Sequence, residues 1–146
     1  MRKKLTQDRP SLREERGDLI YRRRHTVTPA SAKAKGRRFQ QWVRDKILLK
    51  IPGLRAGDVV STPMGVNGTD VQLSPHALDI IPIQTECKNN KSFAVYKIYE
   101  QAKEHGSNEP VVFLKADFKR PLAVVDAEHY LDLWARTIKA EKRKKT

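Results

Sequence analysis

Two carboxylates and one ammonium group stand at positions where they can act together. Asp70 follows a glycine-containing loop, and one residue separates Glu86 from Lys88. Side chains two residues apart on a strand point to the same face, so an extended segment here presents Glu86 and Lys88 together. Carboxylate oxygens are ligands that Mg²⁺ prefers, and a neighbouring lysine can bind an anion. The three residues therefore predict a site for metal-assisted chemistry on a phosphate.

Each of these residues has an expected role. Asp70 and Glu86 would each give one oxygen to Mg²⁺, with Mn²⁺ as a substitute, and the backbone carbonyl of Cys87 would give a third. The ion would lower the pKa of a bound water and neutralise charge on the scissile phosphate. Lys88 would orient the attacking water, help to deprotonate it, or steady the phosphate. The Cys87 side chain points to the other face, and we expect it to pack as a small apolar residue.

Several other residues have polar or aromatic side chains that could serve either the site or only the fold. Gln84, or Gln101 on the following helix, is a candidate to hydrogen-bond the nucleophile or the DNA backbone. The similar motif Asp117-Phe118-Lys119 lies beside an expected hairpin turn, and we interpret it as a solvated turn. Four histidines lack metal-ligand spacing and are expected at the surface or at helix caps: His25, His76, His105 and His129. Core packing is favoured over base stacking for Trp42 and Trp134.

Hydrophobic periodicity and capping signals predict the elements that position the site. The expected strands are residues 59–62, 70–73, 83–88, 111–115 and 122–125. The expected helices run from residue 35 to before Pro52, over 75–80 after Ser74, over 92–105, and onward from Asp126. This order predicts an α/β or α+β domain over residues 35–138, with a central mixed β-sheet flanked by helices.

Positive charge is concentrated at the two ends of the chain. The net charge is +13, and the pI is about 10.1. Residues 1–50 hold 16 Lys and Arg against 5 Asp and Glu, and residues 134–146 hold 6 against 1. Residues 51–133 hold 8 against 11. We therefore expect a basic, flexible N-terminal arm over residues 1–34, with a linker-like stretch at 26–35, and a basic tail over residues 139–146.

Such a charge distribution indicates a polyanionic partner, since Lys and Arg that neutralise phosphates release counterions and bind nucleic acid strongly. Basic tails that serve only solubility are the simpler alternative. The candidate nucleic-acid-binding residues are Arg22, Arg23, Arg24, Lys35, Arg37, Arg38, Ser61 and Thr62. The single cysteine excludes an internal disulfide and a cysteine-rich zinc cluster. No apolar run approaches the roughly 20 residues needed to cross a membrane, so we expect a soluble protein. The N-terminus shows no apolar stretch typical of a secretory signal, and together with the single cysteine this favours a reducing, cytoplasmic setting.

Residues 35–126 resemble the PD-(D/E)xK nuclease superfamily. The resemblance rests on Gly68-Thr69-Asp70, on Glu86-Cys87-Lys88 after Pro82-Ile83, and on Gln101 in the helix that follows. Lys35-Gly36-Arg37-Arg38-Phe39, which opens the first helix, is similar to archaeal Holliday junction resolvases and small phage-encoded nucleases. The resemblance implies a restriction-endonuclease-like core, Mg²⁺-dependent hydrolysis of phosphodiester bonds in branched or duplex DNA, and a homodimer. A phage-encoded nuclease would act in the host cytoplasm.

One residue departs from the resolvase pattern. Resolvases usually place a glutamate in the first helix, where this chain has Gln40. A neutral amide is a weaker metal ligand than a carboxylate, which leaves a non-catalytic nucleic-acid-binding protein on the same fold as the alternative. A basic structural or assembly factor that binds RNA or protein through its tails is a third hypothesis.

Overall fold

The computed structural model describes residues 28–145, and its longest helix begins earlier than the sequence predicted. Helix α2 spans Pro29–Lys50, and the Thr28 side chain caps it by accepting from the Ser31 backbone N–H. Proline is pre-organised for the first helical position. The expected linker up to residue 35 is therefore wrong from Pro29 onward. The rest of the expected arm, including Arg22, Arg23 and Arg24, lies outside the described residues.

The strands form two ladders within the described residues. The strands are β1 (Val59–Ser61), β2 (Val71–Leu73), β3 (Ile83–Asn89), β4 (Glu109–Lys115) and β5 (Leu122–Val124). Strand β4 lies between β3, to which it is parallel, and β5, to which it is antiparallel, while β1 and β2 pair antiparallel with each other. The mixed sheet and the β4–β5 hairpin are confirmed. Strands β1 and β2 form a separate two-stranded ladder beside this sheet.

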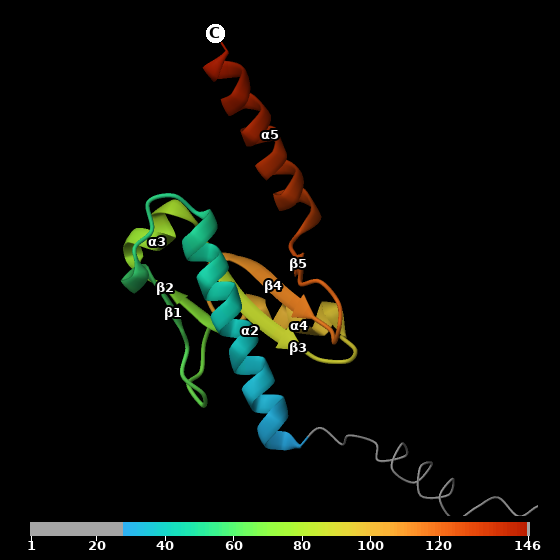
Figure 1. The fold of residues 1–146 in the computed structure, drawn as a ribbon. Helices are drawn as coiled ribbons and strands as arrows, with labels where there is room; N and C mark the ends of the chain where they lie inside the picture. The colour runs from blue at the N-terminus through green and yellow to red at the C-terminus, as the bar shows by residue number, and fades with distance from the viewer. Residues whose placement is uncertain (1–27, 146) are drawn as a thin grey trace, which may run out of the picture.

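Helices cover both faces of the β3–β4–β5 sheet (Figure 1). On one face α2 packs against the strands through Phe39, Val43 and Ile47, together with Val59 and Val71. On the other face, Ile98 and Ala102 of α4 (Val95–Lys103) pack against Val112 and Leu114. The α/β class is confirmed by this helix–sheet–helix arrangement.

Two further helices begin where the sequence placed their caps. Ser74 accepts from the Ala77 N–H and begins α3 (Pro75–Ile80), and Asp126 accepts from Glu128 and His129 and begins α5 (Ala127–Lys144). Helix α5 projects away from the rest of the fold (Figure 1), and it includes most of the expected basic tail. None of the described helices is long and apolar enough to span a membrane.

The core prediction for the two tryptophans is wrong. Trp42 is 40% exposed and Trp134 is 52% exposed. The Trp42 ring stacks against Phe39 of the same helix, and the Lys46 ammonium lies 5.5 Å from the centroid of the Trp42 ring. Trp134 lies on α5, none of whose side chains is buried. Helical spacing identifies the apolar side of a helix, but it does not supply the neighbour that buries it.

Candidate active site

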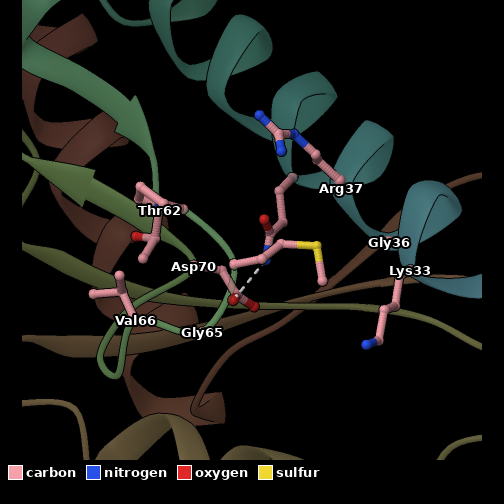
Figure 2. Close-up of a pocket in the computed structure, with 10 residues that line it drawn as sticks. Lys33, Gly36, Arg37, Thr62, Gly65, Val66 and Asp70 are labelled. Atoms are coloured by element: carbon pink, nitrogen blue, oxygen red, sulfur yellow. Dashed lines mark hydrogen bonds between the residues drawn. The ribbon is translucent and has the colours of Figure 1, made fainter. Parts of the chain in front are cut away.

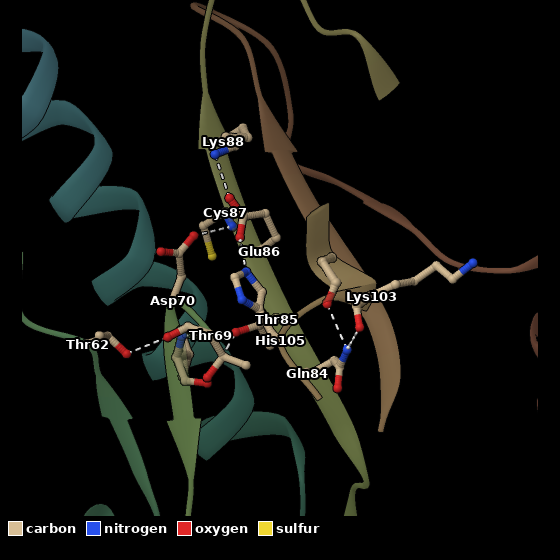
Figure 3. Close-up of polar contacts among 12 residues, drawn as sticks. Thr62, Thr69, Asp70, Gln84, Thr85, Glu86, Cys87, Lys88, Lys103 and His105 are labelled. Atoms are coloured by element: carbon tan, nitrogen blue, oxygen red, sulfur yellow. Dashed lines mark hydrogen bonds and ion pairs between the residues drawn. The ribbon is translucent and has the colours of Figure 1, made fainter. Parts of the chain in front are cut away.

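Asp70 is docked onto the backbone of β3. It ends the loop that joins β1 to β2, and its own N–H donates to the Thr85 carbonyl at 3.0 Å. One carboxylate oxygen, Oδ2, accepts from the Cys87 N–H at 2.6 Å, and the other, Oδ1, accepts from the Gln40 amide of α2 at 2.7 Å. Figure 3 shows Asp70 beside β3 at the level of Cys87, close to Glu86 and Lys88. The loop aspartate and the strand therefore meet, as the sequence predicted.

Glu86 is the buried acid of the site. Only 3% of the residue is exposed, and both oxygens have cationic or hydrogen-bonding partners. Lys88 Nζ lies 2.5 Å from Oε1, and His105 Nε2 lies 2.8 Å from Oε2 (Figure 3). The strand alternation that placed Glu86 and Lys88 on one face is confirmed.

The two carboxylates interact electrostatically. Burial is the main reason why the pKa of Asp70 is raised above its ordinary value of 3.8, and the charge of Glu86 raises it further. The hydrogen bond from the Cys87 N–H is the largest opposing effect, and the charges of Lys88 and His105 also lower this pKa. Two acids in one partly desolvated region favour a cation between them. However, the described residues include no group of three or more His, Cys, Asp and Glu that could hold a metal ion.

Cys87 joins the site through its backbone. Its side chain packs against the α2 cluster, as predicted for a small apolar residue. Burial raises the pKa of its thiol well above the ordinary value, and the charges of Asp70 and Glu86 add to this effect. The thiol is therefore protonated at neutral pH and is a poor nucleophile.

His105 is the site residue that sequence reasoning missed. The sequence placed it at the surface or at a cap, yet it reaches Glu86 from the turn after α4. No spacing signal connects these two residues. The one hint is the position of His105 directly before Gly106, where a helix is expected to end.

Gln84 fixes this turn to β3. Its amide donates to the carbonyls of Ala102 and Lys103 at 2.7 and 3.2 Å, and its Oε1 accepts from the Asn108 N–H at 3.0 Å. A Cβ at position 106 would lie 2.9 Å from the same Oε1, so any other residue there would displace the Gln84 amide. Gln84 is 2% exposed and is therefore a structural residue, contrary to the catalytic alternative.

Gln101, the other candidate for hydrogen bonding to the nucleophile, is not at the site. It is exposed on α4, and none of its described side-chain contacts reaches Asp70, Glu86 or Lys88. The turn after α4 instead brings His105 to Glu86.

A pocket of about 280 Å³ opens beside Asp70 (Figure 2). Helix α2 contributes Lys33, Gly36, Arg37 and Gln40 to its wall, and the β1–β2 loop contributes the residues from Thr62 to Val66. Of the expected nucleic-acid contacts, Arg37 and Thr62 line this pocket. The Thr62 hydroxyl donates to the Thr69 carbonyl and so closes the loop. The Ser61 hydroxyl oxygen is buried, which keeps it from an external ligand.

The remaining basic candidates on α2 lie around a second cavity. Lys35 and Arg38 line a space of about 500 Å³ together with Trp42 and Lys115. Lys35 forms an ion pair with Asp117. Phe118, which follows Asp117, is fully exposed with a φ of 57°, so the interpretation of Asp117-Phe118-Lys119 as a solvated turn is confirmed.

Comparison with known proteins does not assign this chain to a family. It matches no protein-family model, no curated protein and no solved structure. The residues around Asp70 and Glu86 and their geometry are therefore the basis for inferring a function.

Proposed function

We propose that this protein is an Mg²⁺-dependent DNA endonuclease that hydrolyses phosphodiester bonds and selects branched DNA such as a Holliday junction. The observation that carries the proposal is the docking of Asp70 onto the Cys87 N–H, next to the Glu86–Lys88 pair. The acid of the β1–β2 loop meets the acid and the lysine of β3 there, beside a pocket with basic side chains. This combination suits hydrolysis of a phosphodiester better than nucleophilic chemistry by the buried cysteine.

The donor set fits Mg²⁺. This ion is commonly held by one or two carboxylates and keeps several waters, so Asp70 and Glu86 suffice, with the Cys87 carbonyl as a further oxygen. Lys88 and His105 each occupy one position on Glu86, but a carboxylate has about four lone-pair sites and can accept more than one partner. The raised pKa of Asp70 indicates acids that a cation would stabilise. When bound, Mg²⁺ would lower the pKa of a water and neutralise charge on the phosphate.

Other residues around the site would orient its groups and bind the phosphates. Lys88 would present its ammonium group to the phosphate or to the attacking water while it holds Glu86. Gln40 would keep the Asp70 carboxylate in one orientation through its hydrogen bond. Lys33 and Arg37 would bind phosphates on either side of the cleaved bond, since both line the pocket beside Asp70.

The test is a cleavage assay on Holliday-junction, flap, nicked and linear DNA, with and without Mg²⁺. Cleavage should require Mg²⁺ and should be fastest on a branched substrate. Asp70→Asn, Glu86→Gln and Lys88→Ala should each reduce the rate by about 100-fold or more, as for other groups that stabilise a transition state. Binding of the same DNA, followed by fluorescence anisotropy at several salt concentrations, should remain measurable in each variant.

The chain offers a matched control in Asp117-Phe118-Lys119. Asp117→Asn and Lys119→Ala make comparable changes at a solvated turn, so they should leave the cleavage rate within about twofold of the unmodified protein, as expected of surface positions. Full cleavage by the Asp70→Asn protein would overturn the proposal. An equal loss of cleavage rate in the Asp117→Asn and Asp70→Asn proteins would also overturn it.

A non-catalytic nucleic-acid-binding protein on the same fold is the second candidate. It is favoured by Gln40, whose amide contacts Asp70 where the resolvase resemblance implies a carboxylate. Salt-dependent DNA binding without cleavage of any substrate, in either Mg²⁺ or Mn²⁺, would establish this function in place of the first.

A further inference from the structure

Helix α5 is attached to the fold only at its start, as far as the described contacts show. Asp126 caps it, and His129 Nδ1 lies 3.6 Å from Glu109 Oε2 at the beginning of β4. Beyond this first turn the helix extends away from the sheet (Figure 1), and none of its side chains is buried. The apolar side chains beyond the first turn of α5 are therefore accessible to another molecule.

One side of α5 is apolar. Leu131, Trp134 and Ile138 follow the spacing of a single helical face, and Tyr130 makes an edge contact with Trp134 at a centroid separation of 6.4 Å. These four side chains are between 47% and 64% exposed, whereas Leu133 lies on the other side of the helix. Contiguous exposed apolar side chains of this size mark an interaction surface. A phosphate backbone is a poor partner for such a face, since the face is uncharged and offers only the Tyr130 hydroxyl and the Trp134 indole N–H as donors.

The acidic and basic residues of α5 lie in different halves of the helix. Residues 126–135 hold three acidic residues and no Lys or Arg, whereas residues 136–145 hold six Lys and Arg and one Glu. An antiparallel copy of α5 would bring the acidic half of each helix beside the basic half of the other. A parallel copy would place like charges together, which is unfavourable.

We propose that two copies of this chain dimerise through α5, with the helices antiparallel and crossing at Trp134. The contact is isologous, because a two-fold axis at Trp134 places Tyr130 opposite Ile138 of the second copy and Ile138 opposite its Tyr130. The same antiparallel arrangement therefore buries both apolar faces and places opposite charges beside each other. This inference does not depend on nuclease activity.

The oligomeric state of the full chain tests the interface. Sedimentation should show a concentration-dependent dimer of the 16.8 kDa chain. Trp134→Glu should shift it to monomer, with an unchanged unfolding midpoint of the core because no α5 side chain is buried. Leu133→Glu makes the same apolar-to-acidic change on the other side of the helix, so it is the matched control and should remain dimeric. A monomer at all concentrations, or a dimer that persists in Trp134→Glu, would overturn the proposal.

Disulfide trapping tests the orientation in a Cys87→Ala background. In the antiparallel pair, Ala127 lies opposite Glu141 of the second copy, so a mixture of Ala127→Cys and Glu141→Cys proteins should form a crosslinked heterodimer. Either variant alone should not crosslink, because the like positions are then about 21 Å apart along the helices at 1.5 Å per residue. Efficient crosslinking of each variant with itself would instead show a parallel pair and overturn the arrangement.

Discussion

The Thr85 hydroxyl bridges both backbone groups of Val71. The Val71 N–H donates to Thr85 Oγ1 at 2.9 Å, and the same hydroxyl donates to the Val71 carbonyl at 3.2 Å. Thr85 is completely buried, so a side chain takes the place of backbone pairing between β2 and β3. Since Asp70 directly precedes Val71, this bridge holds the Asp70 carboxylate at Cys87.

Replacing the bridging hydroxyl should weaken both the fold and the site. Thr85→Val keeps the shape but leaves the buried N–H and C=O of Val71 without this partner, and unpaired buried groups cost about 1–3 kcal/mol each. We expect the free energy of unfolding to fall by about 2–4 kcal/mol in urea denaturation on that basis. Thr137→Val, which removes a hydroxyl on exposed α5, is the control and should change it by less than about 0.5 kcal/mol. Equal effects at the two positions would contradict the bridging role.

The raised pKa of Asp70 predicts that its charge destabilises the fold. Unfolded chains release the proton near the ordinary value of 3.8, while burial keeps it on Asp70 to a higher pH. Between these two values the unfolded state binds fewer protons, so this group lowers stability as pH rises. Asp70→Asn should therefore be more stable than the unmodified protein at neutral pH, and the gain should disappear below pH 3.8. Urea denaturation across this pH range measures the difference.

Asp117 provides a control of opposite sign. Its hydrogen bond and ion pair with Lys35 hold the pKa of Asp117 below its usual range. The stability that the Asp117 charge gives the fold is present above the ordinary pKa of 3.8 and is lost as pH falls through the lowered value. Asp117→Asn should thus be slightly destabilised at neutral pH. A loss of stability at neutral pH in both variants would contradict the buried-charge account of Asp70.

The hydrogen bond from Gln40 to Asp70 predicts a metal-dependent effect of adding a third carboxylate. Gln40→Glu replaces a donor with a second acid beside Asp70, and loss of a hydrogen bond to a charged group costs about 1.5–3 kcal/mol without metal. Mg²⁺ should restore stability more strongly in this variant than in the unmodified protein, because ligand binding to the folded state raises its stability. Thermal unfolding with increasing Mg²⁺ measures both effects. Gln40→Ala is the control, and an equal response to Mg²⁺ in the two variants would contradict a role for the added carboxylate.

His105 should act as a positioning residue for Glu86. His105→Ala leaves one oxygen of a buried carboxylate without its partner and should lower the free energy of unfolding by about 1–3 kcal/mol. His105→Gln keeps a donor and should recover part of that loss. His76→Ala, at an exposed hydrogen bond to the Gly53 carbonyl, should have less than half the effect of His105→Ala. Indistinguishable unfolding curves for His105→Ala and the unmodified protein would contradict the assignment.

Local patterns in the sequence predicted the strands and helix caps around the site. Alternation over residues 83–88 placed Glu86 and Lys88 together and turned the Cys87 side chain toward the core, because strand geometry depends only on neighbouring residues. Ser74 and Asp126 began helices for the same reason, since a cap bonds within one turn. The early start of α2 at Pro29 carried an equally local signal in Thr28-Pro29, which the high charge and polarity of the N-terminal region obscured.

The sequence by itself determined which residues carry charge, which faces are apolar and where most elements begin. Only the tertiary structure decided that Thr85 ties β2 to β3, that His105 rather than Gln101 reaches Glu86, and that α5 leaves its apolar face uncovered. These contacts join segments far apart in the chain. Their formation depends on how all elements pack, and no short-range spacing rule encodes that packing.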